Sequence, residues 1–161
     1  MDGNSSLIEV KIGALIMDPN TNTPIVVLKG VDSEIVLPIW VGAFEANAIA
    51  LEIEKVVPQR PMTHDLLRNI IVECQLSAAT VIITDLQENT FYARIELIDR
   101  FGEPVVLDAR PSDAIALALR LDCPIYVESK VIELSAASTQ KPDPSENEEA
   151  ATLDEWPELI G

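Results

Sequence analysis

The first group of side chains that could do chemistry lies at residues 60–65, where Arg60, Thr63, His64 and Asp65 surround an expected turn into a helix. Backbone N–H groups at the start of a helix attract anions, and Arg60 and His64 would strengthen that attraction. His64 is the one histidine of the chain and could act as a general base. The structural alternative is that Thr63 and Asp65 cap the helix and His64 is a surface side chain.

The second group lies at residues 108–113, where a strand is expected to end and a helix to begin. Open α/β sheets place ligands at the carboxyl ends of their strands. A phosphate could meet Arg110 and the helix N-terminus here, while Asp108 and Asp113 could hold a hydrated Mg²⁺ or Mn²⁺. The structural alternative is that Ser112 and Asp113 cap the helix, which is worth ~1 kcal/mol, and that Asp108 pairs with Arg110.

Other common catalytic spacings are missing from the sequence. It contains no Cys-x-x-Cys pair, no His-Glu-x-x-His, no glycine-rich phosphate loop and no Gly-x-Ser-x-Gly elbow. The two polar groups are therefore the candidates for chemistry. We expect them to converge on one site, although they lie about 45 residues apart.

Hydrophobic periodicity predicts the elements that must position these groups. Alternating apolar residues predict an antiparallel meander over residues 7–16, 25–29 and 34–41. Apolar residues then recur at helical spacing over residues 44–57 and again over 63–74, which predicts two helices. The second of these helices is expected to bury a stripe made of Leu66, Leu67, Ile70, Ile71 and Cys74.

In the second half of the chain, the apolar pattern predicts a hairpin of residues 80–86 and 91–98 and then a strand over 104–109. A helix over 111–121 begins with Pro111 and is apolar almost all round, so it should be central. Short strands are expected over 124–128 and 131–134. The fold class is therefore α+β, with a mixed, largely antiparallel sheet and about three helices in one compact domain.

Charge divides the chain into two parts. Residues 1–134 hold ten Lys and Arg against twenty Asp and Glu, and residues 135–161 hold one against seven, which gives −10 and −6. Proteins that bind nucleic acid mainly through its phosphates are usually basic, so any such binding here must be local, metal-assisted or weak. We expect a folded domain over 1–134 and an acidic flexible tail over 135–161, disordered to residue 152 and apolar at its end. That end could dock on a partner or on the domain, or simply fray.

We expect a cytoplasmic protein that does not enter membranes. No apolar run reaches the ~20 residues of a membrane span. The first residues lack the basic and apolar segments of a secretory signal. Cys74 and Cys123 lie far apart in apolar surroundings, which favours buried, reduced thiols over a disulfide.

Three motifs resemble the signature of the bifunctional nuclease family, known from bacteria and plants. They are Pro58-x-Arg60-Pro61-x-Thr63-His64-Asp65-Leu66-Leu67, then Thr90-Phe91-Tyr92-Ala93, and the block Asp108-Ala109-Arg110-Pro111-Ser112-Asp113-Ala114-Ile115-Ala116-Leu117-Ala118. The similarity covers about residues 7–133 in order. It implies a compact α+β fold, self-association, and DNase and RNase activity. Some members append a DNA-repair-type helical hairpin, whereas this chain has its acidic tail.

Our first hypothesis is a hydrolase, a metal-assisted nuclease that cuts DNA and RNA without sequence preference. Its catalytic residues would be His64, Asp65, Asp108 and Asp113, and its substrate-binding residues Arg60, Thr63, Arg110 and Ser112. Asp108 and Asp113, with Asp65 as a further candidate, would hold Mg²⁺ or Mn²⁺.

The alternative is a non-catalytic oligomeric module that binds a ligand or a protein. The acidic surface and the Trp156 segment favour it. Under either hypothesis the positive mean hydropathy of +0.20 predicts apolar surface left over after one small core is filled. We therefore expect a homodimer or a higher homo-oligomer.

Overall fold

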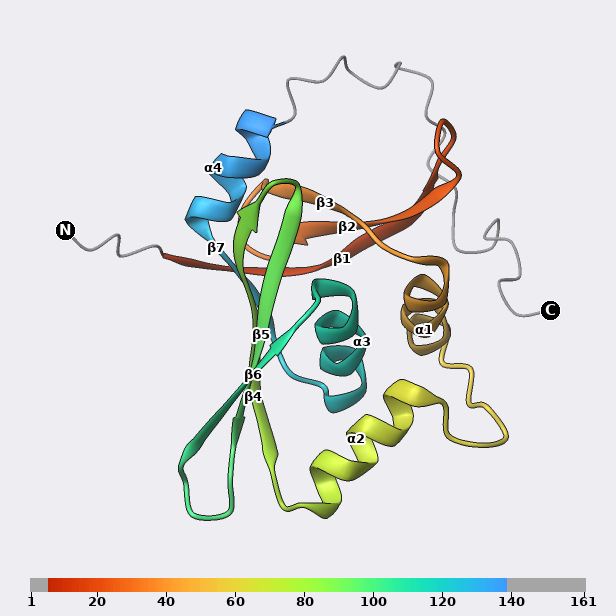
Figure 1. The fold of residues 1–161 in the computed structure, drawn as a ribbon, viewed down its shortest axis with the longest axis vertical. Coiled ribbons are helices and arrows are strands. Elements are labelled where there is room, and N and C mark those ends of the chain that lie inside the picture. The colour runs from red at the N-terminus through yellow and green to blue at the C-terminus, as the bar shows by residue number, and fades with distance from the viewer. Residues whose placement is uncertain (1–5, 139–161) are drawn as a thin grey trace.

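The computed structural model describes residues 6–138, which form one seven-stranded sheet and four helices (Figure 1). The strands are β1 (Leu7–Asp18), β2 (Thr23–Gly30), β3 (Val36–Trp40), β4 (Ser77–Gln87), β5 (Thr90–Ile98), β6 (Pro104–Ala109) and β7 (Ile125–Glu128). The helices are α1 (Ala43–Ile53), α2 (Thr63–Glu73), α3 (Pro111–Leu121) and α4 (Ser129–Ser138). The predicted α+β class is confirmed, with four helices in the described region rather than about three.

The strand order across the sheet is β3-β2-β1-β7-β4-β5-β6. The predicted meander of β1, β2 and β3 and the predicted β4–β5 hairpin are both antiparallel, as expected. The hairpin turns at Glu88 and Asn89, which both have the positive φ that a tight two-residue turn requires. β7 pairs with β4 in parallel and with β1 antiparallel, so the sheet is mixed and largely antiparallel.

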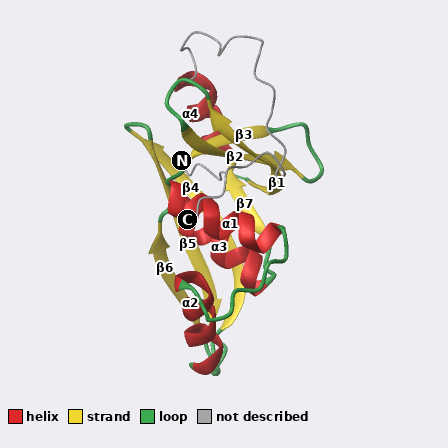
Figure 2. Cartoon of the chain, turned by 90° about the vertical axis from the view of Figure 1, so that its right-hand side faces the viewer, coloured by secondary structure: helices red, strands yellow, loops and turns green. Residues whose placement is uncertain are grey.

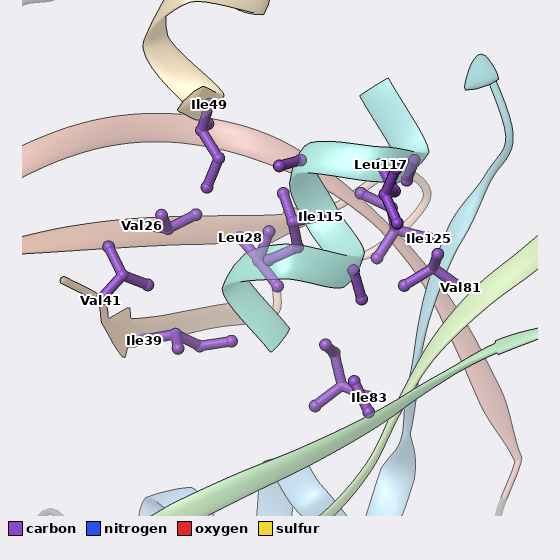
Figure 3. Packing of buried hydrophobic residues seen from close by; sticks show 14 of the residues in the cluster. Val26, Leu28, Ile39, Val41, Ile49, Val81, Ile83, Ile115, Leu117 and Ile125 are labelled. Atoms are coloured by element: carbon purple, nitrogen blue, oxygen red, sulfur yellow. The ribbon is translucent and has the colours of Figure 1, made fainter. Parts of the chain in front are cut away.

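The core lies between this sheet and α1 and α3. α1, α2 and α3 lie on one face of the sheet and α4 on the other (Figure 1). Ile115 of α3 is fully buried among Leu28 and Ile83 of the sheet (Figure 3). Consecutive residues of α3 from Ala114 to Ala118 are buried, which confirms the prediction of a central helix.

The predicted end of one helix and one predicted strand are wrong. α1 ends at Ile53 rather than at residue 57, because Lys55 adopts a left-handed conformation and the Val56 N–H bonds back to the Leu51 carbonyl, which closes the helix. Residues 131–134, expected as a strand, lie in α4. Val131 and Ser135 are buried four residues apart, which is a helical spacing.

The stripe predicted to be buried on α2 is largely exposed. Ile71 is buried, but Leu66 and Ile70 are about half exposed and Leu67 is more than a third exposed. Cys74 is also exposed, and Cys123 is half-buried, so the prediction of two buried thiols is wrong for Cys74. Figure 2 shows α2 at the opposite end of the molecule from α4.

The acidic linker was expected to begin at Ser135. That is wrong for residues 135–138, because α4 continues to Ser138 and Ser135 is buried. Residues 139–161, with the rest of the predicted tail, lie outside the described residues. Within residues 6–138 no helix is long and apolar enough to cross a membrane.

Candidate functional site

The starts of α2 and α3 bring the two polar groups of the sequence together. His64 Nε2 lies 2.8 Å from Asp113 Oδ1, across 49 residues of chain. Both side chains are shielded, with 12% of His64 and 29% of Asp113 exposed. The expectation that the two groups converge is confirmed by this contact.

Arg110 and Glu45 complete this arrangement. The Arg110 guanidinium donates from Nε to Asp113 Oδ2 at 3.0 Å and from Nη2 to Glu45 Oε1 at 2.9 Å. Asp113 first, and Glu45 second, raise the pKa of Arg110, so this cation is firmly charged. Glu45 is a residue that the sequence analysis missed.

The first turns of three helices each carry one acid. These acids are Glu45 in α1, Asp65 in α2 and Asp113 in α3. A carboxylate in the first turn is favoured by the positive end of the helix dipole. The residues that precede the helices are Gly42, Met62 and Arg110, and none of them makes a side-chain cap. Thr63 and Ser112 therefore lie inside the first turns and are not the N-caps that the structural alternative assumed.

Asp65 faces away from His64, toward the other end of α3. Its Oδ2 accepts the Met62 N–H at 2.9 Å, which caps α2, and its Oδ1 accepts Arg120 Nε at 2.9 Å. Burial acts to raise the pKa of Asp65, but these two hydrogen bonds and the Arg120 charge outweigh it and lower the pKa. Asp65 thus fits the structural alternative, as a cap and an ion-pair partner.

Arg120 is the second residue that the sequence analysis missed. Its side chain is only 5% exposed. It also donates from Nη1 to the Ala116 carbonyl and from Nη2 to the Ala48 carbonyl, both at 3.0 Å. Arg120 therefore connects α1, α2 and α3, and it holds the start of α2 against α3 where His64 meets Asp113.

Asp108 does not join the site. It pairs across the sheet with Arg94, whereas its neighbour Ala109 pairs with the buried Ala93, whose side chain faces the core below α3. Because side chains alternate along a strand, Asp108 projects from the opposite face of the sheet. It is exposed there, and Arg110 pairs with Asp113 and Glu45 instead.

The predicted pair of metal ligands, Asp108 and Asp113, does not fit this geometry. Asp108 projects from one face of the sheet, whereas Asp113 lies in α3 on the other side. Both oxygens of Asp113 already accept hydrogen bonds, from His64 and from Arg110. Within residues 6–138 no group of three or more His, Cys, Asp and Glu side chains is placed to hold a metal ion.

Arg60 is exposed in the loop that enters α2. A hollow of about 220 Å³ lies beside this loop, and Pro61, Asp65 and Arg120 contribute to its lining. The candidate site therefore has two parts along α3, a polar cluster at Asp113 and a hollow at Arg120.

The polar cluster is suited to proton transfer beside an anion. When Nε2 of His64 carries its proton, Asp113 accepts it and orients the ring, and Nδ1 remains as a proton acceptor. Two-thirds of the Arg110 side chain is exposed, so its guanidinium can also meet a phosphate from solvent. A histidine held by a carboxylate next to an arginine could supply a general base or acid beside a bound phosphate.

Comparison with known proteins identifies one family model and several relatives. The sequence matches the bifunctional nuclease domain over residues 26–140. An uncharacterised protein of Mycobacterium tuberculosis is 45% identical over 144 residues, which cover 89% of this chain and 84% of that protein. Bifunctional nuclease 1 of rice, Oryza sativa, is 28% identical over 125 residues, which cover 76% of this chain and 38% of the rice protein.

Proposed function

The chain belongs to the bifunctional nuclease domain family, and from that membership we propose that it hydrolyses phosphodiester bonds in DNA and RNA. The observation that carries the proposal is the His64–Asp113 contact, with Arg110 bound to the same carboxylate. These three residues come from the two motifs in which the chain most resembles the family.

In this proposal His64 is the proton acceptor for the attacking water and Asp113 orients its ring. Arg110, assisted by Arg60 from the neighbouring loop, neutralises the phosphate. Thr63 and Ser112 are in the first turns of α2 and α3, whose backbone N–H groups add to the attraction for an anion. Asp65 takes no part in this proton transfer.

The requirement for Mg²⁺ or Mn²⁺ remains a prediction, and no catalytic step is assigned to a metal. The −10 charge of residues 1–134 repels a polyanion, so a cation that accompanies the substrate would favour binding. Nuclease assays with EDTA, Mg²⁺ and Mn²⁺ test this directly. Equal cleavage in all three would show that the metal prediction is wrong.

The deciding experiment compares three purified variants on single-stranded DNA and RNA. His64→Ala and Asp113→Asn should lower the cleavage rate by about 10²–10⁴-fold, the range expected when a general base or its orienting partner is lost. Asp32→Asn changes an exposed loop carboxylate on the same scaffold and should leave the rate unchanged. Equal cleavage by all three would identify a contaminating nuclease and overturn the proposal.

The second candidate is a non-catalytic binding module that self-associates. The exposed stripe of α2, formed by Leu66, Leu67, Ile70 and Cys74, supports it, because an amphipathic helix normally turns such a stripe inward. We propose that a second copy of the chain covers this stripe. A two-fold axis lets the same stripe cover itself, and α4, the last described helix, lies at the opposite end of the molecule from α2 (Figure 2).

A further inference from the structure

The hollow beside Arg120 has the shape and chemistry of a small binding site. It lies between the end of α1, the loop that enters α2, and α3. Its walls are mainly apolar and include Leu51, Val56, Val57, Pro58 and Pro61. Glu52, Asp65 and Arg120 supply the charged part of the lining. A volume of about 220 Å³ suits one ring system rather than a whole drug-sized ligand.

Arg120 keeps hydrogen-bonding capacity in this hollow. A guanidinium has five N–H donors. Three of them are used by Asp65, Ala116 and Ala48, and no acceptor among residues 6–138 is recorded for the other two. Since 95% of this side chain is buried, a ligand in the hollow is the natural acceptor for the unused donors.

Asp65 places acceptors directly beside these donors. Each of its oxygens accepts one hydrogen bond, from Arg120 or from the Met62 N–H, and each retains a second lone pair. The hollow therefore offers a donor and an acceptor next to each other beside apolar side chains. This combination matches the edge and the two faces of a nucleobase.

We propose that this hollow binds a nucleobase, with guanine as the preferred base. Guanine presents the O6 acceptor next to the N1–H and N2–H donors, so it can accept from Arg120 and donate to Asp65 at once. Cytosine and adenine have one exocyclic amino donor beside a ring acceptor, and uracil has a single N–H between two carbonyls. None of these three presents two adjacent donors to one carboxylate.

The position of the hollow ties it to the proposed reaction. Arg120 lies seven residues after Asp113 on α3, a rise of about 10 Å. One nucleotide spans such a distance from its base edge to its phosphate. The inference rests on the proposed action on nucleic acid. It adds that the guanine of a nucleotide occupies the hollow while His64 and Asp113 act on the phosphate of the same nucleotide. Cleavage should therefore be favoured next to guanine.

The test uses the full chain carrying His64→Ala, so that binding is measured without turnover. Isothermal titration with the four ribonucleoside 5′-monophosphates should show GMP binding at least tenfold more tightly than AMP, CMP or UMP. Val56→Trp, which fills the hollow, should remove at least nine-tenths of the GMP affinity. Val36→Trp, on the edge strand β3, is the matched control, because Val36 and Val56 are similarly exposed, at 55% and 47%. Melting curves of both variants establish that they are folded.

A second variant reports on hydrogen bonding rather than on space. Asp65→Asn replaces a carboxylate oxygen by an amide donor, so GMP affinity should fall and affinity for xanthosine monophosphate, which has a carbonyl at position 2, should rise. A simple loss of structure would lower both. Equal binding of all four nucleotides, no binding of GMP, or GMP binding that survives Val56→Trp would overturn the inference.

The outcomes for this inference and for the proposed function are separable. GMP binding that depends on Val56, in a wild-type protein that cuts neither DNA nor RNA, would support the base site and overturn the hydrolytic function. Cleavage that depends on His64 but shows no preference for guanine in an oligonucleotide of defined sequence would support the function and overturn the base site.

Discussion

At the scale of single residues, the contact between His64 and Asp113 depends on a neighbour that does no chemistry itself. Arg120 binds Asp65, the residue that follows His64 in the chain. Because Asp65 also caps α2, this ion pair fixes the first turn of that helix. Its guanidinium is also bound to the backbone of α1 and α3. The proposed dyad is therefore positioned by the ion pair of Arg120 with Asp65, in which Arg120 lies about two helical turns after Asp113 on α3.

Replacing Asp65 by asparagine should lower the free energy of unfolding at neutral pH by about 1–3 kcal/mol, because it removes the charged partner of a buried arginine. The folded-state pKa of Asp65 lies below its ordinary value of 3.8, so its stabilising effect is complete above that pH and is lost as the pH falls through the folded-state pKa. Urea unfolding of wild type and variant should therefore differ by a constant amount at pH 5–7 and converge below pH 3.8. A difference that grows with acid would contradict the assignment.

Glu45 competes with a phosphate for Arg110. Glu45→Gln should tighten the binding of a short single-stranded oligonucleotide by a factor of about two to five, because an ion pair with such an exposed arginine is worth ~0.2–1 kcal/mol. Fluorescence anisotropy at fixed salt measures this. Glu34→Gln, at an exposed position before β3, should leave the affinity unchanged. Weaker binding of Glu45→Gln would mean that Glu45 orients Arg110 for its ligand.

Residue types and spacing were enough to find His64, Asp113 and Arg110, because polar side chains at helix starts stand out in an apolar chain. They were not enough to find Glu45 and Arg120, whose partners are 65 and 55 residues away. The sequence also grouped Asp108 with Asp113. Side chains alternate along β6, so Asp108 projects from the other face of the sheet. The sequence does not show this, because it follows from the pairing of Ala109 with Ala93.

At the scale of elements, strand and helix positions were well predicted wherever one periodicity ran for many residues, as in β1, β5 and α3. Prediction was wrong where the signal was short. Residues 131–134 fit an alternating and a helical pattern equally well, and the burial of Val131 and Ser135, four residues apart, agrees with the helix. α2 was predicted correctly as a helix, but its periodicity did not show that most of its apolar stripe is exposed.

α4 is the last element of the described residues. We predict that the acidic tail is dispensable for folding. Truncation after Ser138 should therefore leave the melting temperature within about a degree of that of the full chain. Truncation after Leu134 removes the last four residues of α4, including the buried Ser135. The loss of about 1 kcal/mol should lower the melting temperature by a few degrees. Equal melting of both truncations would show that the end of α4 contributes nothing.

At the scale of the whole molecule, acidic charge and apolar surface oppose each other. The domain carries −10, yet α2 exposes a stripe of large apolar side chains. At ~0.15 M salt, repulsion between two subunits is screened beyond ~8 Å, so contact between the stripes should dominate. The same repulsion should weaken self-association as salt is removed.

The exchange of Leu66 and Ile70 for glutamine tests this balance. Light scattering of the wild type at micromolar concentration should give at least twice the 17.6 kDa of one chain in physiological salt, and the double variant should give one chain mass. Val106→Gln, on the edge strand β6, changes an equally exposed apolar residue elsewhere and should stay associated. A wild-type mass of one chain at both low and physiological salt would contradict self-association.

The place of β7 in the sheet constrains the order in which the molecule can be assembled during synthesis. This strand of four residues is the last of the seven to leave the ribosome, yet it lies between β1 and β4 and joins the two halves of the sheet. Until it emerges, the meander and the hairpin have no bridge, and β1 presents an unpaired edge. Pairings as distant as Leu7 with Glu128 give the fold a high contact order, so folding should be slow and should finish only after most of the chain has been made.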